Sequence, residues 1–171
     1  MMYSNQATYL ENSKAKGFKY DFENSKYSFI GILPKNDTDF KLSTLNIDSF
    51  LLSKKQGKVL IGIPKMNYQS EIDIQELVNH YNINEIFTEK ANFTRISESN
   101  LSINKMIQKN NLTIAEKGTL KSNLKQQTLY NLDDDYKEQI ILNRPYAYLI
   151  INNETNDILF IGKVVRINQN S

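Results

Sequence analysis

Two nearly continuous apolar runs flank a polar turn in the stretch Tyr146-Ala-Tyr-Leu-Ile-Ile151, Asn152-Asn-Glu-Thr-Asn-Asp157 and Ile158-Leu-Phe-Ile-Gly-Lys-Val-Val165. β-branched and aromatic residues dominate both runs, and such residues favour strands. The Asn, Asp and Thr residues between them are typical of a tight connection. The stretch therefore predicts a buried β-hairpin.

Upstream of the hairpin, two shorter apolar runs also predict strands. They are Tyr27–Pro34 and Lys58–Pro64, and each ends in a proline, which is tolerated at a strand end or a bulge. Between them, apolar residues recur at roughly helical spacing from Thr38 to Leu51, with Thr38 or Asp39 as the capping residue. One or two short helices are expected there.

A further helix is indicated by four apolar residues at the spacing i, i+3, i+4 and i+7, namely Ile74, Leu77, Val78 and Tyr81. This spacing predicts one buried stripe along the helix. His80 stands beside the stripe, so we expect it to be an exposed structural residue. The mixed pattern, with strands dominant, is that of an α+β fold.

The segment 101–116 alternates between polar and apolar residues, as a strand does, and its phase changes near Asn110-Asn111, where a bulge is expected. From Thr119 to about Glu138 no clear periodicity is present. A connection of that length in a compact domain is either functional or disordered.

Composition excludes several classes of function. A chain of 171 residues suits one ordinary domain with a single core. The absence of Cys removes disulfide scaffolds, thiolate metal sites and cysteine nucleophiles. The net charge of +2 is spread along the chain, so no nucleic-acid partner is implied. No apolar run is long enough to cross a membrane, so no membrane partner is implied.

Residues suited to catalysis or metal binding are scarce. His80 is the only histidine, which leaves almost nothing for a histidine-based triad or metal cluster. Asp133-Asp134-Asp135 lacks the ligand spacing, turn glycine and terminal glutamate of a calcium loop, and we interpret it as a solvated loop tip. The glycines are scattered and form no phosphate-binding loop. The sequence therefore predicts a protein that is not an enzyme and that uses no metal or other cofactor.

Several blocks together resemble the carboxy-terminal half of the serpin family, the serine protease inhibitor superfamily. Val59-Leu-Ile-Gly-Ile-Pro-Lys65 is similar to the family's strand that ends in Pro-Lys. Ala91-Asn-Phe-Thr-Arg-Ile-Ser97 is similar to its Ala-Asp-Phe-Ser-Gly-Ile-Ser block, and Glu116-Lys-Gly-Thr119 to its hinge signature. Asn143-Arg-Pro-Tyr146 and the last apolar run resemble the end of the reactive loop and the closing strand.

The resemblance also extends toward the amino terminus. Met1-Met2 resembles the start of a strand of sheet C, and Ser28–Pro34 resembles a strand of sheet B. The implied structure is a partial serpin fold, β-rich, with sheets B and C plus part of sheet A, a few short helices and a long exposed reactive loop. Residues 1–171 would form the carboxy-terminal portion of a single serpin domain, with the loop at about 117–140.

The resemblance implies a suicide-substrate inhibitor of a serine or cysteine protease. The protease cleaves the loop and becomes acylated, and the hinge end of the loop then inserts into sheet A. The hinge maps onto Glu116, Lys117, Gly118 and Thr119. Counting forward from the hinge gives Leu132–Asp133 as the scissile bond, which would suit a chymotrypsin-like target. Counting back from Pro145 gives Asp134–Asp135, which would suit a caspase- or granzyme-like target.

Two features point away from a self-sufficient inhibitor. Family members are longer, so we expect a truncated or partial form that lacks the amino-terminal half of the fold. In addition, if Thr119 faces inward on insertion, so do Lys121, Asn123 and Lys125. Burying unpaired ammonium groups is costly. The alternative function is therefore a non-inhibitory serpin-like binding or storage protein, and a third is a β-rich interaction module that works alone.

The sequence gives little guidance on location. The family's usual location is extracellular. Residues 1–12 are too polar for the hydrophobic part of a signal peptide, so an intracellular location stays open. Asn-x-Ser/Thr sequons begin at Asn36, Asn92, Asn100, Asn111 and Asn153. Chance matches are expected in so Asn-rich a chain, and the sequons are weak evidence for secretion.

Overall fold

The computed structural model of the protein describes residues 1–23, 25–36, 41–115 and 136–166. Contacts divide the chain into two compact units, where its length favoured a single core. Unit 1 comprises Met1–Lys65 and Ile114–Ser171, and unit 2 comprises Met66–Thr113.

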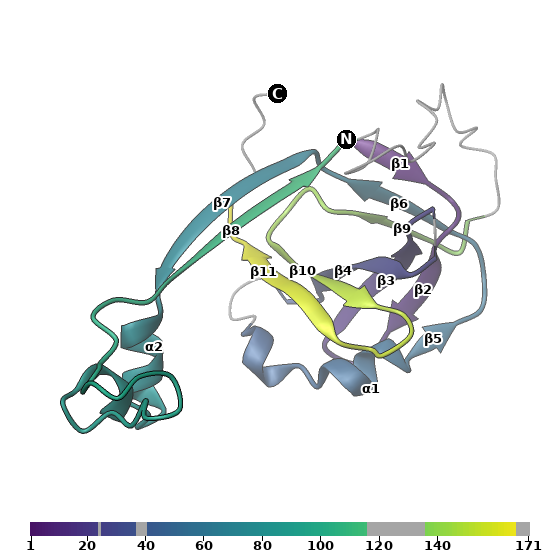
Figure 1. The fold of residues 1–171 in the computed structure, drawn as a ribbon. Coiled ribbons are helices and arrows are strands. Elements are labelled where there is room, and N and C mark those ends of the chain that lie inside the picture. The colour runs from purple at the N-terminus through teal and green to yellow at the C-terminus, as the bar shows by residue number, and fades with distance from the viewer. Residues whose placement is uncertain (24, 37–40, 116–135, 167–171) are drawn as a thin grey trace. The chain divides into compact units, whose positions relative to one another are not determined.

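Unit 1 contains a six-stranded antiparallel sheet in the order β11-β10-β4-β3-β2-β5 (Figure 1). Its strands are β2 (Thr8–Glu11), β3 (Ala15–Asp21), β4 (Tyr27–Pro34), β5 (Lys54–Lys55), β10 (Tyr146–Asn152) and β11 (Ile158–Val164). The predicted hairpin is confirmed, because Tyr146 pairs with Val164 at one end and Ile151 with Ile158 at the other. Its predicted burial holds for β10 only, because β11 is the edge strand of the sheet and most of it is exposed. The predicted strand Tyr27–Pro34 is also confirmed and pairs with both β10 and β3.

One face of this sheet packs against a short helix, α1 (Ile47–Leu51), which follows the 3-10 helix η1 (Leu42–Thr44). The predicted short helices are thus confirmed. Asn46 caps α1, and its side chain accepts a hydrogen bond from the Ser49 backbone nitrogen at 2.8 Å. The expected capping residues, Thr38 and Asp39, lie outside the described residues.

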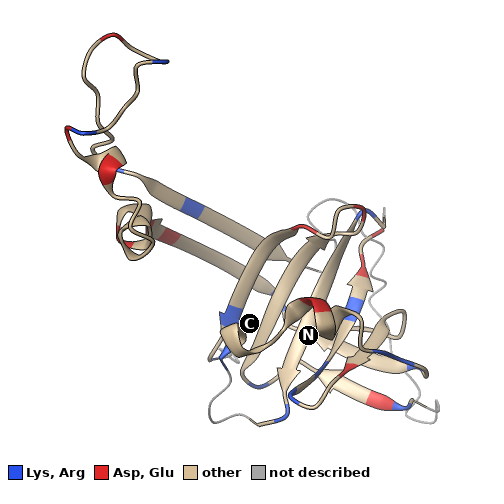
Figure 2. Ribbon diagram, turned by 90° about the horizontal axis from the view of Figure 1, so that it is seen from below, with Lys and Arg blue, Asp and Glu red and all other residues tan. Residues whose placement is uncertain are grey.

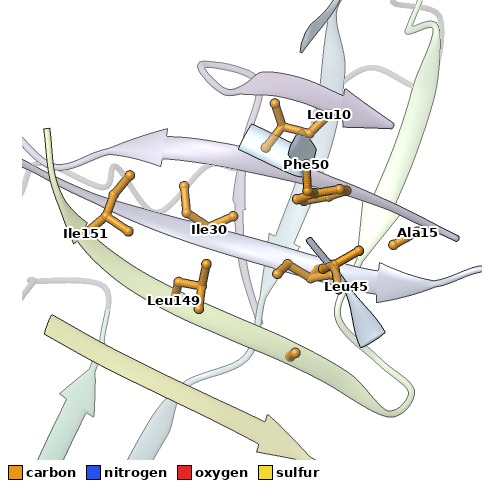
Figure 3. Packing of buried hydrophobic residues seen from close by; sticks show 9 residues of the cluster. Leu10, Ala15, Ile30, Leu45, Phe50, Leu149 and Ile151 are labelled. Carbon is orange, nitrogen blue, oxygen red and sulfur yellow. The ribbon is translucent and has the colours of Figure 1, made fainter. Parts of the chain in front are cut away.

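The core between α1 and the sheet is apolar throughout (Figure 3). Its buried members are Leu10, Ala15, Ile30, Ile32, Leu45, Phe50, Ala147, Leu149 and Ile151. Phe50 projects from α1 into this cluster and is fully buried. Because alternate residues of a strand face opposite sides, Ile30 and Ile32 of β4 meet Leu149 and Ala147 of β10 on this face.

The opposite face of the sheet carries an aromatic row. The rings of Phe18 and Phe29 have centroids 6.1 Å apart, and those of Phe29 and Tyr148 are 5.9 Å apart. Gly31 lies on the same face, since a side chain there would meet the ring of Phe18 and the side chain of Leu142. Leu142 directly follows a strand of the second sheet, which therefore covers part of this face.

The second sheet of unit 1 has three strands in the order β1-β6-β9. They are β1 (Met2–Ser4), β6 (Val59–Ile63) and β9 (Glu138–Ile141). β1 runs antiparallel to β6, whereas β9 runs parallel to it, with Ile61 opposite Ile140. The run Lys58–Pro64 predicted as a strand is therefore confirmed as β6, which is buried along its whole length.

Unit 2 is built on the strand pair β7 (Met66–Asp73) and β8 (Ile107–Ile114), with α2 (Ile74–His80) and the 3-10 helix η2 (Glu85–Phe87) between them. Asp73 caps α2, since its side chain accepts a hydrogen bond from the Gln75 backbone nitrogen. The predicted helix is confirmed, but its predicted buried stripe is wrong. Leu77 is 49% exposed and Tyr81 65% exposed. Helical periodicity identifies an apolar face without supplying the surface that covers it.

The strand expected over residues 101–116 also differs from the structure. It starts only at Ile107, and the expected bulge near Asn110-Asn111 is absent. Glu71 meets Lys109 and Ser70 meets Asn110, while Asn67 meets Thr113 in the same register on the far side of the expected bulge. The alternation changes phase in the sequence because residues 101–106 lie outside the strand, so their apolar positions need not match those of the strand itself.

Among the residues that the structure describes, no helix is both long and apolar enough to cross a membrane.

Candidate functional site

The sequence places the expected reactive loop between β8 and β9. Its hinge and both candidate scissile bonds lie outside the described residues: Glu116, Lys117, Gly118, Thr119, Leu132, Asp133, Asp134 and Asp135. Lys121, Asn123 and Lys125 lie outside them too. The structure describes the two attachments of the segment, because β8 ends at Ile114 and β9 begins at Glu138. Residues 138–140, the end of the expected loop, lie in β9.

β9 is a short edge strand, held by backbone hydrogen bonds and by apolar burial. The Lys137 nitrogen donates to the Lys58 carbonyl oxygen at 3.0 Å, and the Leu142 nitrogen donates to the Gly62 carbonyl oxygen at 2.9 Å. Ile140 and Leu142 are fully buried. The segment after residue 135 is therefore anchored within a few residues.

An ion pair adds a link between the two sheets of unit 1. Lys16 Nζ in β3 lies 2.8 Å from Glu138 Oε1 in β9 and donates a hydrogen bond to it. The side chains are 26% and 32% exposed, so solvent screens the pair only in part. Lys16 belongs to the six-stranded sheet and Glu138 to the three-stranded sheet.

A second polar group lies close to this ion pair and consists of Tyr9 and Glu11 of β2 and Lys35, which follows β4. Lys35 Nζ lies 2.6 Å from Glu11 Oε1. Hydrogen bonds from Lys35 and Tyr9 lower the pKa of the Glu11 carboxyl. Burial, the hydrogen bond to Glu11 and the nearby charges of Glu11 and Glu138 raise the pKa of the Tyr9 hydroxyl. Glu11 is thus paired with Lys35, and Glu138 with Lys16. The raised pKa keeps the hydroxyl of the buried Tyr9 protonated.

The other attachment, β8, is buried only toward its carboxy-terminal end. Leu112 and Ile114 are buried, whereas Lys109 pairs with Glu71 of β7 at 3.0 Å in solvent. An open groove of about 480 Å³ lies along the strand pair. It is lined by Gln69, Ser70, Glu71, Lys109, Asn110 and Asn111, all polar. The groove therefore offers hydrogen-bonding groups.

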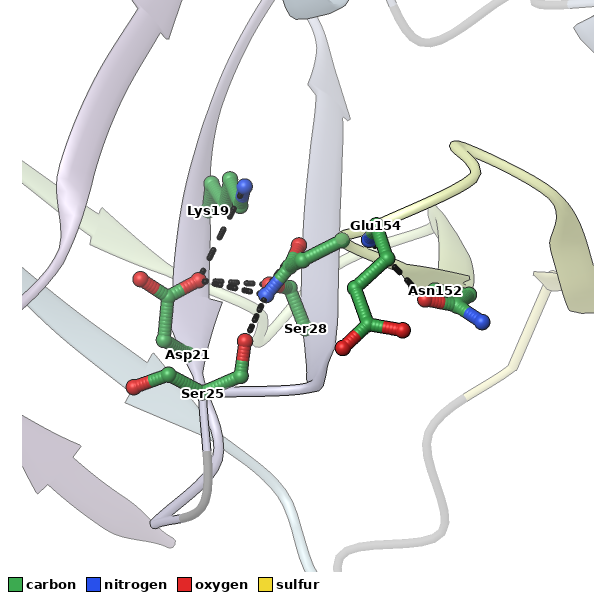
Figure 4. Close-up of polar contacts among 7 residues, drawn as sticks. Lys19, Asp21, Ser25, Ser28, Asn152 and Glu154 are labelled. Atoms are coloured by element: carbon green, nitrogen blue, oxygen red, sulfur yellow. Dashed lines mark hydrogen bonds and ion pairs between the residues drawn. The ribbon is translucent and has the colours of Figure 1, made fainter.

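A polar cluster closes one end of the six-stranded sheet (Figure 4). The buried Ser28 hydroxyl lies 2.5 Å from Asp21 Oδ1 and 2.7 Å from Asn153 Oδ1. Asn153 Nδ2 donates to the Ser25 carbonyl oxygen at 2.7 Å. Both ends of the Asn153 amide are therefore engaged inside the protein, although the sequence marked this residue only as a sequon.

The histidine and the acidic side chains form no catalytic or metal-binding cluster among the described residues. His80 is exposed, as expected, and its ring contacts that of Tyr81 at a centroid distance of 5.4 Å. Within the described ranges, no three His, Asp or Glu side chains gather closely enough to hold a metal ion. Figure 2 shows basic and acidic residues interspersed along the strands and turns.

Sequence reasoning missed the groups that anchor β9. Lys16 and Glu138 are 122 residues apart in the chain, and the two sheets that carry them are brought together only by the tertiary fold. A usable signal was present on β2 and β3, where Glu11 and Lys16 sit at positions that face a buried layer. That pattern indicates inward-pointing charges that need partners.

Comparison with known proteins identifies the family. The sequence profile of the family described as Serpin (serine protease inhibitor) matches residues 1–167. The chain therefore belongs to the serpin family, whose members are mostly protease inhibitors rather than enzymes. Its β-rich α+β fold corresponds to part of the serpin fold, with the six-stranded sheet as sheet B and the three-stranded sheet as sheet C.

Individual relatives are distant in sequence. Serpin B5 of Xenopus tropicalis is 24% identical over 169 residues, which covers 91% of this chain and 43% of that protein. Human neuroserpin is 28% identical over 120 residues, covering 70% of this chain and 29% of that protein. Plasminogen activator inhibitor 1 of Sus scrofa is 25% identical over 178 residues, covering 96% of this chain and 44% of that protein. The chain spans less than half the length of these relatives.

Solved structures of serpins also resemble this chain. Tengpin, a thermophilic serpin in its native state, matches with a TM-score of 0.78 and 26% identity, over 97% of this chain and 46% of that one. Uncleaved ovalbumin matches with a TM-score of 0.75 and 19% identity, over 97% of this chain and 44% of that one.

Proposed function

We propose that this chain is part of a serpin-type suicide inhibitor of serine proteases, with residues 116–135 as the bait. The observation that carries the proposal is the family match along residues 1–167, which includes both attachments of this segment and the segment itself. The anchored strand β9 on one side and the strand β8, whose Leu112 and Ile114 are buried, on the other support it, since a bait needs two fixed ends.

The proposed reaction begins as ordinary proteolysis. The serine Oγ of the protease attacks the carbonyl carbon of the scissile bond, the C–N bond breaks, and the proton of the serine passes through the histidine of the protease to the new amino terminus. An acyl-enzyme ester remains on the amino-terminal side of the cut. Insertion of the hinge, residues 116–119, as a strand would then distort the protease before water hydrolyses the ester.

We propose Leu132–Asp133 as the scissile bond, with Asp134–Asp135 as the alternative. A protease with a large apolar primary pocket would accept Leu132, whereas Asp134 needs a basic pocket. The polypeptide as isolated from its source is incubated with chymotrypsin and, separately, with granzyme B. An SDS-stable complex with chymotrypsin, and a released fragment that begins at Asp133, are expected. Absence of a complex with every serine protease tried would overturn the inhibitory proposal.

The non-inhibitory alternative is favoured by one observation, the three polar residues Lys121, Asn123 and Lys125. Under this alternative the loop is cut without trapping, and cleavage brings no rise in melting temperature. The double substitution K121A/K125A separates the two functions. It should raise the trapped fraction if buried ammonium groups slow insertion, while K54A/K55A on the exposed strand β5 serves as the control and should change nothing.

We also propose that the rest of a serpin domain covers this chain's exposed apolar side chains. Several large apolar residues are exposed on β11, on α2 and just beyond α2: Ile158, Leu159, Ile161, Leu77, Tyr81 and Ile83. Large apolar side chains exposed at several close positions of one element, as on β11, are unusual in a monomer that works alone. The intact mass of the native polypeptide tests this, since a mass near 19.9 kDa would contradict it. An extracellular location, the usual one for the family, is part of the proposal.

A further inference from the structure

The sequon Asn92-Phe-Thr94 forms an Asx turn on the surface of unit 2, where Asn92 and Thr94 are both exposed. Asn92 Oδ1 accepts a hydrogen bond from the Thr94 hydroxyl at 2.8 Å and another from the Thr94 backbone nitrogen at 3.2 Å. Asn92 Nδ2, the atom that a sugar would be joined to, has no hydrogen-bond partner among the described residues. The turn therefore presents a free amide nitrogen beside the hydroxyl of its own sequon.

We propose that Asn92 is a site of N-linked glycosylation and that Asn153, which also begins a sequon, is not. This inference rests on the proposed extracellular location, because the modification belongs to secreted chains. The donor is an oligosaccharide joined to a lipid through a diphosphate. Asn92 Nδ2 attacks the anomeric carbon of the first sugar, an N–C bond forms, and the C–O bond to the diphosphate breaks. The amide loses one proton to a base, and the lipid diphosphate leaves.

The turn at Asn92 is held by bonds between neighbours in the chain. Besides the two bonds from Thr94, the backbone nitrogens of Ile96 and Ser97 donate to the Phe93 carbonyl oxygen at 2.8 and 3.1 Å. Local bonds of this kind form without help from distant parts of the fold. The acceptor geometry is therefore available to a transferase while the chain is being exported, before the sheets assemble.

The turn itself does not need asparagine at this position. The similar block of the family, Ala-Asp-Phe-Ser-Gly-Ile-Ser, has an aspartate there, and a carboxylate oxygen accepts the same bonds. An aspartate has no amide nitrogen and cannot be joined to a sugar in this way. The acceptor at Asn92 is therefore a feature of this chain and not of the family block.

The sequon at Asn153 has the opposite arrangement. The Thr155 hydroxyl donates to Asp157 Oδ2 at 2.6 Å and so points away from its own asparagine. Asn153 Nδ2 donates to the Ser25 carbonyl oxygen at 2.7 Å and to Asp21 Oδ1 at 3.4 Å. A sugar on this nitrogen would replace a hydrogen that bonds inside the cluster. A modified Asn153 is therefore incompatible with the folded turn.

The remaining sequons lack the bond between hydroxyl and amide. In β8, the Thr113 hydroxyl of the Asn111 sequon donates to Asn67 Oδ1 on β7, at 3.4 Å. Asn100 is exposed, but it makes no hydrogen bond with Ser102 among the described residues. The sequon at Asn36 ends outside those residues. Of the sequons that the structure describes in full, the one at Asn92 has its hydroxyl on its own asparagine.

The first test uses the polypeptide as isolated from its source. An amidase that releases N-linked glycans, applied in heavy-oxygen water, converts each modified asparagine to a labelled aspartate. Mass spectrometry of peptides then locates the label. We expect it at Asn92 in most copies and at Asn153 in none. Unlabelled Asn92 in polypeptide recovered from outside the cell would overturn the proposal, and so would label at Asn153.

The second test separates the acceptor from the location. The full polypeptide is produced behind a secretion signal in cultured animal cells, and the same label is read in the whole lysate. Asn92→Asp keeps the turn but removes the nitrogen, so it should lose exactly the Asn92 glycan. Thr94→Ala should lose that glycan as well, whereas Thr94→Ser, which keeps a hydroxyl, is the matched control and should retain it.

The two tests fail in different ways. An unmodified Asn92 in the parent polypeptide of the second test would overturn the proposal whatever the native location is. Label at Asn92 that survives Thr94→Ala would overturn the role given to the hydroxyl. Label at Asn92 in the second test, together with a native polypeptide that is found unmodified inside the cell, would show that the proposed location fails while the acceptor assignment stands.

Discussion

The ring of Tyr148 in β10 lies against Gly162 in β11, where a Cβ atom would come within 2.5 Å of Cζ and 2.6 Å of the hydroxyl oxygen. The two residues are direct partners in the hairpin ladder. A side chain at position 162 would therefore displace the Tyr148 ring, which stacks on Phe29 at a centroid distance of 5.9 Å. Glycine at this position makes the aromatic row on this face of the sheet possible.

We expect Gly162→Ala to destabilise the protein by about 1–3 kcal/mol, the usual cost of overpacking a filled site. Urea denaturation measures the change. In a Tyr148→Leu background the same substitution should cost much less, because the ring that it displaces is gone. An equal cost in both backgrounds would show that the penalty comes from the strand backbone and not from Tyr148.

Ser28 should matter more than its small side chain suggests. Its buried hydroxyl lies between Asp21 Oδ1 and Asn153 Oδ1, so Ser28→Ala leaves polar atoms of both residues without this bond. The expected loss of stability is about 1–3 kcal/mol. Ser49→Ala, at an exposed position of α1, is the control and should stay within about 0.5 kcal/mol.

The same cluster predicts non-additivity. Asn153→Ala removes the partner of Ser28 and the hydrogen bond to the Ser25 carbonyl oxygen. The double variant with Ser28→Ala should therefore lose less stability than the sum of the two single variants, because the members of one network share their bonds. Strict additivity would contradict a joint role.

Two neighbouring apolar residues at the end of α1 should respond in opposite ways. Phe50 is fully buried in the core between α1 and the sheet, whereas Leu52 is 81% exposed. Phe50→Ala should cost about 3–5 kcal/mol, and Leu52→Ala less than about 0.5 kcal/mol. Thermal or urea unfolding checks both. A large effect at Leu52 would mean that another surface covers it in the native protein.

Tyr9 should give the protein an alkaline limit of stability. Burial and neighbouring carboxylates raise the pKa of its hydroxyl above the ordinary value. A group whose pKa is raised by folding contributes stability that is complete below its unfolded-state pKa, about 10 for tyrosine, and is lost as the pH rises further. Tyr9→Phe should therefore flatten the fall of melting temperature above about pH 10. Tyr81→Phe, at an exposed position, should leave that slope unchanged.

Local patterns predicted the strands of the hairpin, β4 and β6 well. Each is a short run of β-branched and aromatic residues bounded by Pro or by polar turn residues, and such a run favours a strand whichever neighbour it acquires. The family signature was equally local, because each of its blocks can be recognised without knowing what it touches. Helices α1 and α2 were predicted from spacing for the same reason.

Patterns were less reliable where burial depends on a partner. The apolar stripe of α2 predicted a buried face, yet Leu77 and Tyr81 are exposed. Periodicity states that one side of a helix is apolar, and only a neighbouring element can remove that side from water. The expected bulge failed similarly, because alternation alone does not show where a strand begins.

The sequence by itself determined the family, the strands β4, β6, β10 and β11, and the position of residues 116–135 between two attachments. Tertiary structure alone decided how those attachments are held. The link between Lys16 and Glu138 and the cluster of Asp21, Ser28 and Asn153 join residues more than a hundred positions apart. A strand's pattern specifies which face it buries, but it carries no information on which distant strand lies beside that face.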